Sequence, residues 1–409
     1  ALDRYLELVP GSAWGYRERA LRRADKGEYE LALSDTAVAL ELEPESPVSL
    51  HCHAKILTGL HRRTEAIEML RRTISLDIDR TDAAVDLMDL AGDREESLDF
   101  IRFIENEMRR QVSHGEIVPV FQRLAWSWME PEELLEKLRG FCQERPDLWQ
   151  TWSARISHAL RMSCPEDALE AATAMTRTFP LLPRAWMDLA RVHQATDDGA
   201  KEVAATSKAF EISPAWDEAA RNHADSLERN GQVKEAEQIL RSSVASAPLN
   251  PANKGFLADL LRRTGRKEEA VDVLMEALRG SPFYAWGWAQ LGIWMRRDGR
   301  TDEAVEFLQS ISLANEHRAA WWSTAADAWM DLGRPEEAVV AVRKALDASP
   351  EDMDLRDKLA WMLCESGQVE EALSLCEPRA GEGKVTRELA GRRAWILMKS
   401  GQPVRAIES

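Results

Sequence analysis

The residues most able to do chemistry in this sequence are four potential metal ligands, His51, Cys52, His53 and His61. Imidazole and thiolate groups are common protein ligands of zinc and copper. On a helix, however, positions 51 and 53 point roughly 200° apart, so the two imidazoles cannot easily share one ion. The pattern favours packing or surface histidines, and we predict neither a metal site nor a cofactor.

Paired carboxylates are the second group with chemical potential, as in Glu268-Glu269 and Glu336-Glu337. Such pairs can serve as general acid and base, but both fall at expected helix starts, where acidic residues complement the positive end of the helix dipole. The sequence also has no Gly-rich phosphate loop, no His-Glu-x-x-His and no Gly-x-Ser-x-Gly motif. We therefore predict that this chain is not itself an enzyme.

The elements that position these residues are set by a repeat of 34 residues. Eight prolines are separated by 34 residues or a whole multiple of 34, and they are Pro10, Pro44, Pro146, Pro180, Pro214, Pro248, Pro282 and Pro350. Arrays of this kind bury the apolar face of each unit only against its neighbours. The period thus predicts an array rather than a globular domain.

Each unit reads as two helices. A glycine stands 17 residues after the proline phase, at Gly27, Gly231, Gly265, Gly299, Gly333, Gly367 and Gly401, and an alanine follows five residues later in each case. The glycine supplies a left-handed cap that ends the first helix. Acidic residues then open the second helix, the phased proline ends it, and the phased small residues let the two helices approach closely.

A 34-residue helix–turn–helix with Trp, Leu, Gly or Ala, Ala and Pro at these spacings resembles the tetratricopeptide repeat. The best match is Ala285 to Pro350, with Trp288, Leu291, Gly292, Gly299 and Ala304 followed by Trp322, Ala326, Gly333, Ala338 and Ala345. The resemblance covers nearly the whole chain, in about twelve units. It implies an all-α solenoid of antiparallel helix pairs, wound into a right-handed superhelix.

We expect one continuous array with three stretches: regular units at 1–78, degenerate units at 79–145, and regular units at 146–409. In the degenerate stretch the phase is kept but Val112 replaces proline. Residues 94–111 read as one longer helix, and Pro119 and Pro131 predict short or re-aimed helices after it. This stretch is either a degenerate repeat or a bend that meets a partner. In the unit after Pro180, Asp197 replaces the glycine, and we expect a locally repacked turn.

Composition limits the compartment and the partners. The net charge of −17 counts against nucleic acid as a partner, and 44% hydrophobic residues suffice for a continuous core. No apolar run is long enough to span a membrane, and no signal-peptide pattern opens the sequence. Five sparse cysteines favour a reducing, cytoplasmic setting.

Both ends read as cut within a unit, since residues 1–9 resemble half of a second helix and residues 402–409 only open one. Terminal units of such arrays carry a polar capping face, which neither end shows. We expect the chain to be a piece of a longer protein. This motivates an alternative function, the substrate-recruiting or sensing arm of a larger enzyme or signalling protein.

The resemblance further implies that the first helices line a groove that binds extended peptides, with positions two, five, nine, twelve and thirteen of each unit facing it. Position one is the third residue after the proline phase. The predicted groove residues are Arg191, Arg221, Arg262, Arg263, Arg296, Arg297, Trp286, Trp361, Trp395, Asp327, Asp331 and Asp357. By the same numbering Trp152, Trp186, Trp288 and Trp322 at position four, and Trp329 at position eleven, belong to the packed core.

These groove residues predict a protein-interaction scaffold that binds an extended, acidic partner segment, because arginine pairs with carboxylates in a bidentate way. Three structural readings stay open. The tryptophans can be half-buried between adjacent first helices, the arginines can serve the helix dipole, and some arginines can pair with Asp225 and Asp259. RNA binding is a weaker alternative, suggested by arginine mixed with aromatic residues.

Overall fold

The computed structural model describes residues 2–378, 386–402 and 406, and every regular element in these ranges is a helix. The all-α prediction is therefore confirmed. The chain divides into two compact units, Ala1–Ser213 (unit 1) and Pro214–Ser409 (unit 2). Each unit is built from antiparallel helix pairs, which confirms the expected solenoid architecture.

Unit 1 contains thirteen described helices. They are α1 (Leu2–Leu8), α2 (Ala13–Asp25), α3 (Tyr29–Leu42), α4 (Pro47–Gly59), α5 (Arg63–Leu76), α6 (Thr81–Asp89), α7 (Arg94–Arg110), α8 (Ile117–Trp126), α9 (Pro131–Glu144), α10 (Trp149–Arg161), α11 (Pro165–Thr178), α12 (Pro183–Ala195) and α13 (Gly199–Ile212).

Unit 2 contains eleven described helices. They are α14 (Asp217–Arg229), α15 (Val233–Ser246), α16 (Pro251–Arg263), α17 (Lys267–Gly280), α18 (Ala285–Arg297), α19 (Thr301–Asn315), α20 (Ala319–Asp331), α21 (Pro335–Ala348), α22 (Met353–Glu365), α23 (Val369–Leu375) and α24 (Arg387–Lys399). The expected helix start after residue 402 falls largely outside the described residues.

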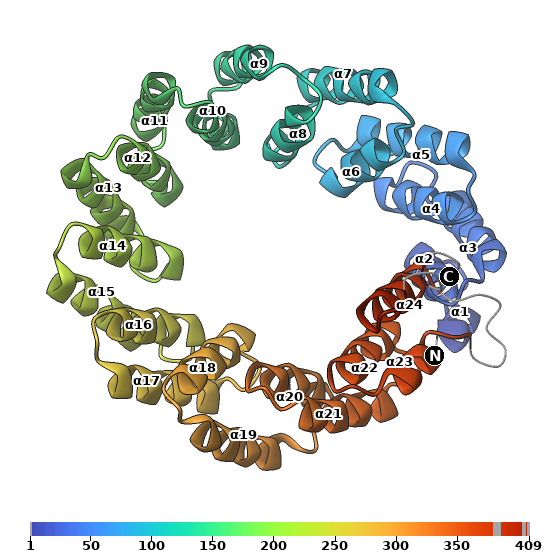
Figure 1. The fold of residues 1–409 in the computed structure, drawn as a ribbon. Coiled ribbons are helices and arrows are strands. Elements are labelled where there is room, and N and C mark those ends of the chain that lie inside the picture. Colours follow the sequence, from blue (N-terminus) through green and yellow to red (C-terminus); the bar gives the residue numbers. More distant parts are fainter. Residues whose placement is uncertain (1, 379–385, 403–405, 407–409) are drawn as a thin grey trace. The chain divides into compact units, whose positions relative to one another are not determined.

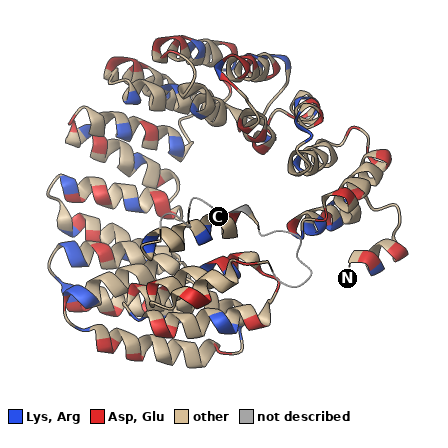
Figure 2. Ribbon diagram, turned by 45° about the vertical axis from the view of Figure 1, so that its right-hand side comes forward, with Lys and Arg blue, Asp and Glu red and all other residues tan. Residues whose placement is uncertain are grey.

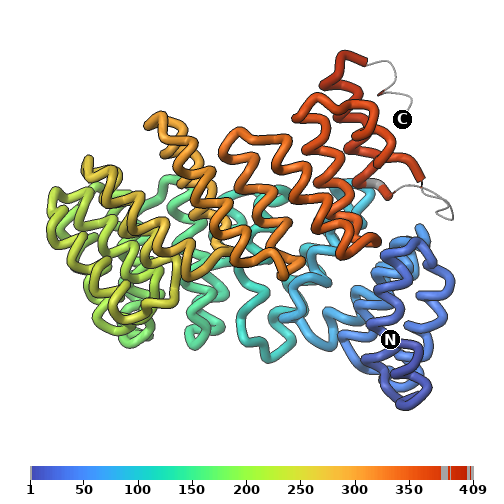
Figure 3. The backbone as a smooth tube through the Cα atoms, turned by 90° about the horizontal axis from the view of Figure 1, so that it is seen from below, coloured from blue at the N-terminus to red at the C-terminus, as the bar shows by residue number. Residues whose placement is uncertain are grey.

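Within each unit the helices form two layers (Figure 1). The even-numbered helices from α2 onward are the first helices of the pairs, and the odd-numbered helices that follow them are the second helices. The tube in Figure 3 shows successive pairs of unit 2 stacked side by side. A side chain on a first helix therefore meets the first helices before and after it, as well as its own second helix.

The phased small residues form the contact between the two helices of a pair. The phased alanines Ala32, Ala66, Ala168, Ala236, Ala270, Ala304, Ala338 and Ala372 have no exposed surface. Gly292 of α18 lies instead at the contact with the next first helix, α20, since a Cβ atom there would lie 2.8 Å from the backbone oxygen of Asp331. The requirement for small residues is therefore steric, as the repeat pattern predicts.

The turn inside each pair depends on one residue with positive φ. All seven phased glycines adopt it, from Gly27 (φ 76°) to Gly401 (φ 77°). His61, Ser163 and Asp197 stand at the same phase without being glycine, and they adopt it as well, with φ of 58°, 58° and 57°. Because this conformation costs an L-residue roughly 1–2 kcal/mol, the packing of the pair must impose it.

The irregular stretch of unit 1 keeps a continuous core. As predicted, residues 94–110 form one long helix of 17 residues, α7, while α6 and α8 before and after it are short. One hydrophobic cluster extends from Ala54 through Phe100 and Phe121 to Ala154, so it passes through the stretch without interruption. The departure from the repeat pattern thus changes helix lengths but not the burial of the core.

Candidate partner-binding surface

The predicted groove residues lie on the first helices, all in unit 2 except Arg191. We call the first helices of unit 2, α14, α16, α18, α20, α22 and α24, the inner layer. Figure 2 shows Lys and Arg interspersed with Asp and Glu along the chain. Four of the predicted side chains, those of Arg262, Arg263, Asp327 and Asp357, meet a group of opposite charge on, or at the end of, a neighbouring first helix.

Arg262 of α16 forms a two-pronged ion pair with Asp298, the residue that caps the end of α18. The distance from its Nη2 to Asp298 Oδ1 is 2.9 Å, and its guanidinium lies 5.5 Å from the ring centroid of Trp294. The hydrogen bond from Arg262 lowers the pKa of Asp298 below its usual range. Arg262 therefore joins two repeats instead of presenting a free charge.

Arg263, the next residue of α16, turns toward the preceding first helix. Its Nη2 lies 2.9 Å from Glu228 and 3.5 Å from Asp225, both on α14, and its Nη1 lies 3.5 Å from Asp259. Arg221 of α14 lies 3.8 Å from Asp225 and 5.4 Å from the ring centroid of Phe256. Pairing with Asp225 and Asp259, one of the structural readings of the sequence, is thus observed for Arg263.

The predicted acidic residues at the C-terminal end of the inner layer are paired in the same way. Lys358 of α22 lies 2.7 Å from Asp327 of α20, and Arg392 of α24 donates two hydrogen bonds, of 2.8 and 2.7 Å, to Asp357 of α22. These contacts join residues about one repeat apart. The inner layer therefore carries a series of ion pairs between adjacent first helices.

Arg296 and Arg297 at the end of α18 differ from the other predicted arginines. Both are exposed, and neither comes within 4 Å of a carboxylate among the described residues. One repeat earlier Arg262 has Asp298 as its partner, but the corresponding position for Arg296 is the buried Leu332. Likewise, Arg263 has Glu228 as its partner, but the residue one repeat after Glu228, at the place where Arg297 would need a carboxylate, is Arg262. The series of pairs is therefore open at this place.

Asp331 lies on α20 beside this opening. Burial and the neighbouring carboxylate of Asp327 raise its pKa, and Arg296 opposes this effect only through space. The Nε of Arg296 donates instead to the carbonyl of Gly292, at 3.4 Å. The two guanidiniums of α18 thus remain available for another acidic group.

The three predicted groove tryptophans are partly buried against neighbouring residues. Trp286 of α18 is 38% exposed and packs over Gly255 of α16, where an added Cβ would lie 2.8 Å from its ring. Trp395 lies beneath Arg392 and Lys399, at 5.4 and 5.0 Å from the ring centroid. Trp361 is of intermediate exposure. Packing against the preceding first helix, the structural reading of these residues, is therefore observed for Trp286.

Arg191 of unit 1 is engaged within its own repeat. Its Nη1 lies 3.0 Å from Asp188, whose side chain is fully buried, and 3.3 Å from the hydroxyl of Ser157 on α10. This arginine thus contacts both its own helix and the preceding first helix.

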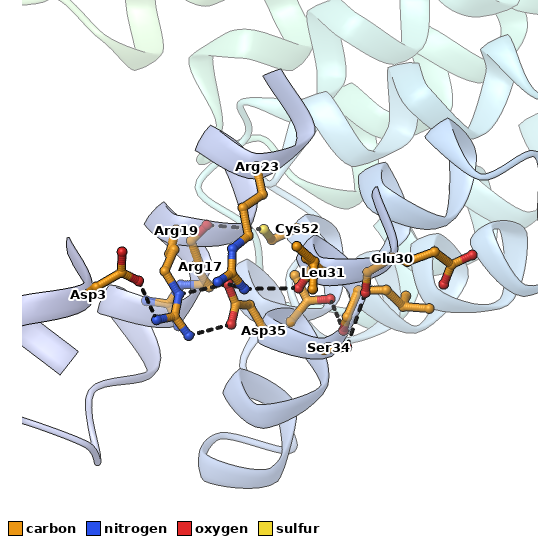
Figure 4. Close-up of polar contacts among 11 residues, drawn as sticks. Asp3, Arg17, Arg19, Arg23, Glu30, Leu31, Ser34, Asp35 and Cys52 are labelled. Carbon is orange, nitrogen blue, oxygen red and sulfur yellow. Dashed lines mark hydrogen bonds and ion pairs between the residues drawn. The ribbon is translucent and has the colours of Figure 1, made fainter. Parts of the chain in front are cut away.

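Two carboxylates of unit 1, each clamped by two arginines, carry no mark in the repeat pattern. Asp35 of α3 is 3% exposed and accepts hydrogen bonds from Arg19 and Arg23 of α2, at 2.7–2.9 Å (Figure 4). Asp167 of α11 accepts from Arg155 at 2.8 and 2.9 Å and from Arg139 at 2.8 Å. Although burial opposes it, the pKa of Asp167 is lowered because these guanidiniums donate to its carboxylate.

The position-four tryptophans share one hydrogen bond. In each of them the indole N–H donates to the carbonyl of the residue at the proline phase, six positions earlier, as in Trp186 to Pro180 (2.9 Å) and Trp322 to Glu316 (3.2 Å); Trp152 and Trp288 do the same. Trp288 and Trp329 are buried, whereas the other three are half-buried. The fully buried Trp321 stands at a position where the preceding units carry Gly287, Asn253 and Ala219, so the repeat pattern missed it.

The histidine group of α4 contacts other residues of unit 1. The two ring nitrogens of His51 lie 2.7 Å from Asp86 and 3.4 Å from Asp82, on α6, and His53 Nδ1 lies 2.8 Å from the hydroxyl of Thr36. Burial raises the pKa of Cys52 to about 11. Across the described ranges, no three His, Cys, Asp or Glu side chains are grouped so that they could hold a metal ion.

Most of unit 2 matches known family models in sequence. Residues 260–408 and residues 221–285 match two models of the tetratricopeptide repeat, while no curated protein matches the chain in sequence. The complex of Naa15 and Naa10 bound to HypK-THB is similar at 16% identity and a TM-score of 0.45, over 100% of this chain and 71% of that one. Yeast Tom70 is similar at 12% identity and a TM-score of 0.37, over 100% and 95% of the two chains.

The class of protein is thus an α-solenoid of helix pairs with a 34-residue period. The two family matches together cover residues 221–408, and this part of the chain belongs to the tetratricopeptide-repeat family. Repeats of this family indicate a protein-interaction scaffold. Among the helices described, none is both long enough and apolar enough to cross a membrane. The cytoplasmic setting stays a prediction.

Proposed function

We propose that this chain is an interaction scaffold whose inner layer binds an extended partner segment, and that acidic groups of this segment dock on Arg296 and Arg297. The observation that carries the proposal is the unpaired state of these two guanidiniums at the end of α18, among the described residues. In contrast, Arg262 and Arg263, at the same positions one repeat earlier, are both paired.

The chemistry of the opening fits a carboxylate. Arginine presents a planar fork of N–H donors that matches a carboxylate, and two such forks lie next to each other here. Trp286 lies at the other end of the same helix and keeps 38% of its surface exposed, so an apolar side chain of the partner can contact it. Since most other basic groups of the inner layer already have acidic partners, an acidic segment has one preferred place of docking.

The test uses a labelled peptide that alternates glutamate and leucine, and its binding is followed by fluorescence anisotropy. We expect Arg296→Ala with Arg297→Ala to raise the Kd at least about tenfold, equivalent to about 1.4 kcal/mol, because both arginines that pair with carboxylates of the peptide are lost. The melting temperature should stay near that of the wild type, because no ion pair of the described residues is broken.

Two controls sharpen this experiment. Lys234→Glu changes the net charge by the same amount as the double alanine variant but lies on α15, outside the inner layer, so it should leave the Kd within about twofold. Arg262→Ala removes a paired arginine and should lower the melting temperature. If the double variant binds the peptide as the wild type does, or if the glutamine analogue of the peptide binds equally well, the proposed docking place is wrong.

A further inference from the structure

A second place in unit 2 has the composition of a cation-binding site. A cleft of about 520 Å³ lies between the end of α19, the start of α20 and the last turns of α21. Its lining residues are Glu316, His317, Trp322, Lys344 and Asp347, and we call it the Trp322 cleft. It is formed by other residues than the opening beside Arg296 and Arg297.

The indole of Trp322 is fixed and already carries a cation. Its N–H donates to the carbonyl of Glu316 at 3.2 Å, which orients the ring. The ammonium group of Lys344 lies 3.9 Å from the ring centroid, within the range of a strong cation–π contact. An alkylammonium group is thus seen to be held on this ring.

The two carboxylates of the cleft have no basic partner. Lys344 comes within 4 Å of neither Asp347, three residues further along α21, nor Glu316, and no other basic group of the described residues pairs with them. With one ammonium and two carboxylates, the cleft carries an excess of negative charge when His317 is neutral. A second cation, or a better one than Lys344, would therefore be stabilised there.

The repeat itself supplies a comparison, because Trp186 and Lys208 stand in the same positions as Trp322 and Lys344. There Lys208 is paired with Glu211, at 3.0 Å, and no cation lies on the ring of Trp186 among the described contacts. The residues that correspond to Glu316 and His317 are Pro180 and Leu181. The unit of Trp322 thus departs from the repeat at two positions that line the cleft.

From these contacts we infer that the Trp322 cleft binds a guanidinium or alkylammonium side chain from a basic segment of a partner protein. The incoming cation lies on the indole of Trp322, Glu316 and Asp347 balance its charge, and Lys344 is the resident cation that it displaces. The net charge of −17 favours the approach of such a basic segment.

The test is a titration of the full chain, labelled with ¹⁵N in its tryptophan indoles, with a short peptide that alternates lysine and serine. The signal of Trp322 is assigned by its loss in Trp322→Phe. In the wild type this signal should shift and saturate. Lys344→Met keeps the length of the side chain but removes the competing cation, so the Kd should fall about threefold or more. Glu316→Gln with Asp347→Asn should raise it by a similar factor.

Lys208→Met is the matched control, since it removes the equivalent lysine beside Trp186, and it should leave the titration of Trp322 unchanged. The melting temperature of each variant shows that the repeat is folded. The inference is overturned if Lys344→Met binds the peptide no more tightly than the wild type. It is also overturned if an aspartate–serine peptide shifts the Trp322 signal instead, because the cleft would then select anions through Lys344 and His317.

Discussion

At the scale of single residues, several arginines of this protein join neighbouring repeats. Arg262 pairs with Asp298 of the next repeat, and Arg263 pairs with Glu228 of the preceding one. Whether an arginine is paired depends on a residue one repeat away, as the contrast between Asp298 and Leu332 shows. The type of side chain alone therefore does not distinguish a structural arginine from one that can bind a ligand.

A prediction at this scale concerns Asp167, the carboxylate between Arg139 and Arg155 whose side chain is 9% exposed. Asp167→Asn should destabilise unit 1 by about 2–3 kcal/mol at pH 7, because two guanidiniums lose their charged acceptor. Its folded-state pKa lies below the ordinary 3.8. The ionised carboxylate thus contributes stability above about pH 4, and this contribution is lost as the pH falls through the folded-state pKa.

Thermal unfolding of the wild type and Asp167→Asn from pH 7 down to pH 3 checks this prediction, and the difference between them should shrink below about pH 4. The control is Asp302→Asn. The side chain of Asp302 is 93% exposed and forms an ion pair with Arg334, so the loss of this pair should change the free energy of unfolding by less than about 0.5 kcal/mol. A difference that stays constant over the whole pH range would contradict the proposed role of the charge.

At the scale of elements, the turn between the two helices of a pair is imposed by their packing. The left-handed residue occurs at the glycine phase even where the sequence has His61, Ser163 or Asp197. In the irregular stretch, the same phase falls on Glu95 and Met129, and neither adopts positive φ. The conformation thus follows the regular helix pair and not the presence of glycine.

Ser163→Gly should therefore stabilise the protein by roughly 1 kcal/mol, because glycine adopts positive φ without the steric cost of a Cβ atom. The same chemical change at Ser242, an exposed residue inside α15, should destabilise it by about 0.5–1 kcal/mol, because glycine is a poor helix former. Urea unfolding of the two variants measures these changes in the free energy of unfolding. Changes of the same sign would show that the left-handed turn at 163 carries no strain.

At the scale of the whole molecule, each repeat contacts only its neighbours, so stability is a sum of local terms. Gly292 is the place where α18 approaches α20 most closely, whereas a Cβ at Gly280, the last residue of α17, would meet no atom within 4 Å. A methyl group added at Gly292 must push α18 and α20 apart, whereas a methyl group added at Gly280 enters open space.

Gly292→Ala should destabilise the repeats around α18 and α20 by about 1–3 kcal/mol, and Gly280→Ala should be neutral or slightly stabilising. Hydrogen exchange followed by mass spectrometry checks the extent of the effect. Protection should fall in residues 285–331 and their neighbours, while Leu2–Ile212 of unit 1 should keep the wild-type rates. A uniform loss along the chain would show that the array unfolds as one cooperative body.

Much of the fold could be predicted from the sequence because the repeat is local. The phased glycines, alanines and prolines act within one helix pair, and the long helix that was predicted at residues 94–111 is observed at residues 94–110. The candidate site was harder to predict from the sequence. The position of Arg296 on the inner layer could be predicted, but its lack of a partner depends on Leu332, which lies in the next repeat.

By itself the sequence determined the period, the two helices of each unit and the side of the pair on which each residue lies, because these depend on spacing along one chain segment. Only the tertiary structure decided which charges are paired, that Trp321 is fully buried, and that Ser163 adopts a glycine conformation. These outcomes depend on side chains about one repeat away. Local spacing cannot specify them, since they arise when neighbouring helices pack together.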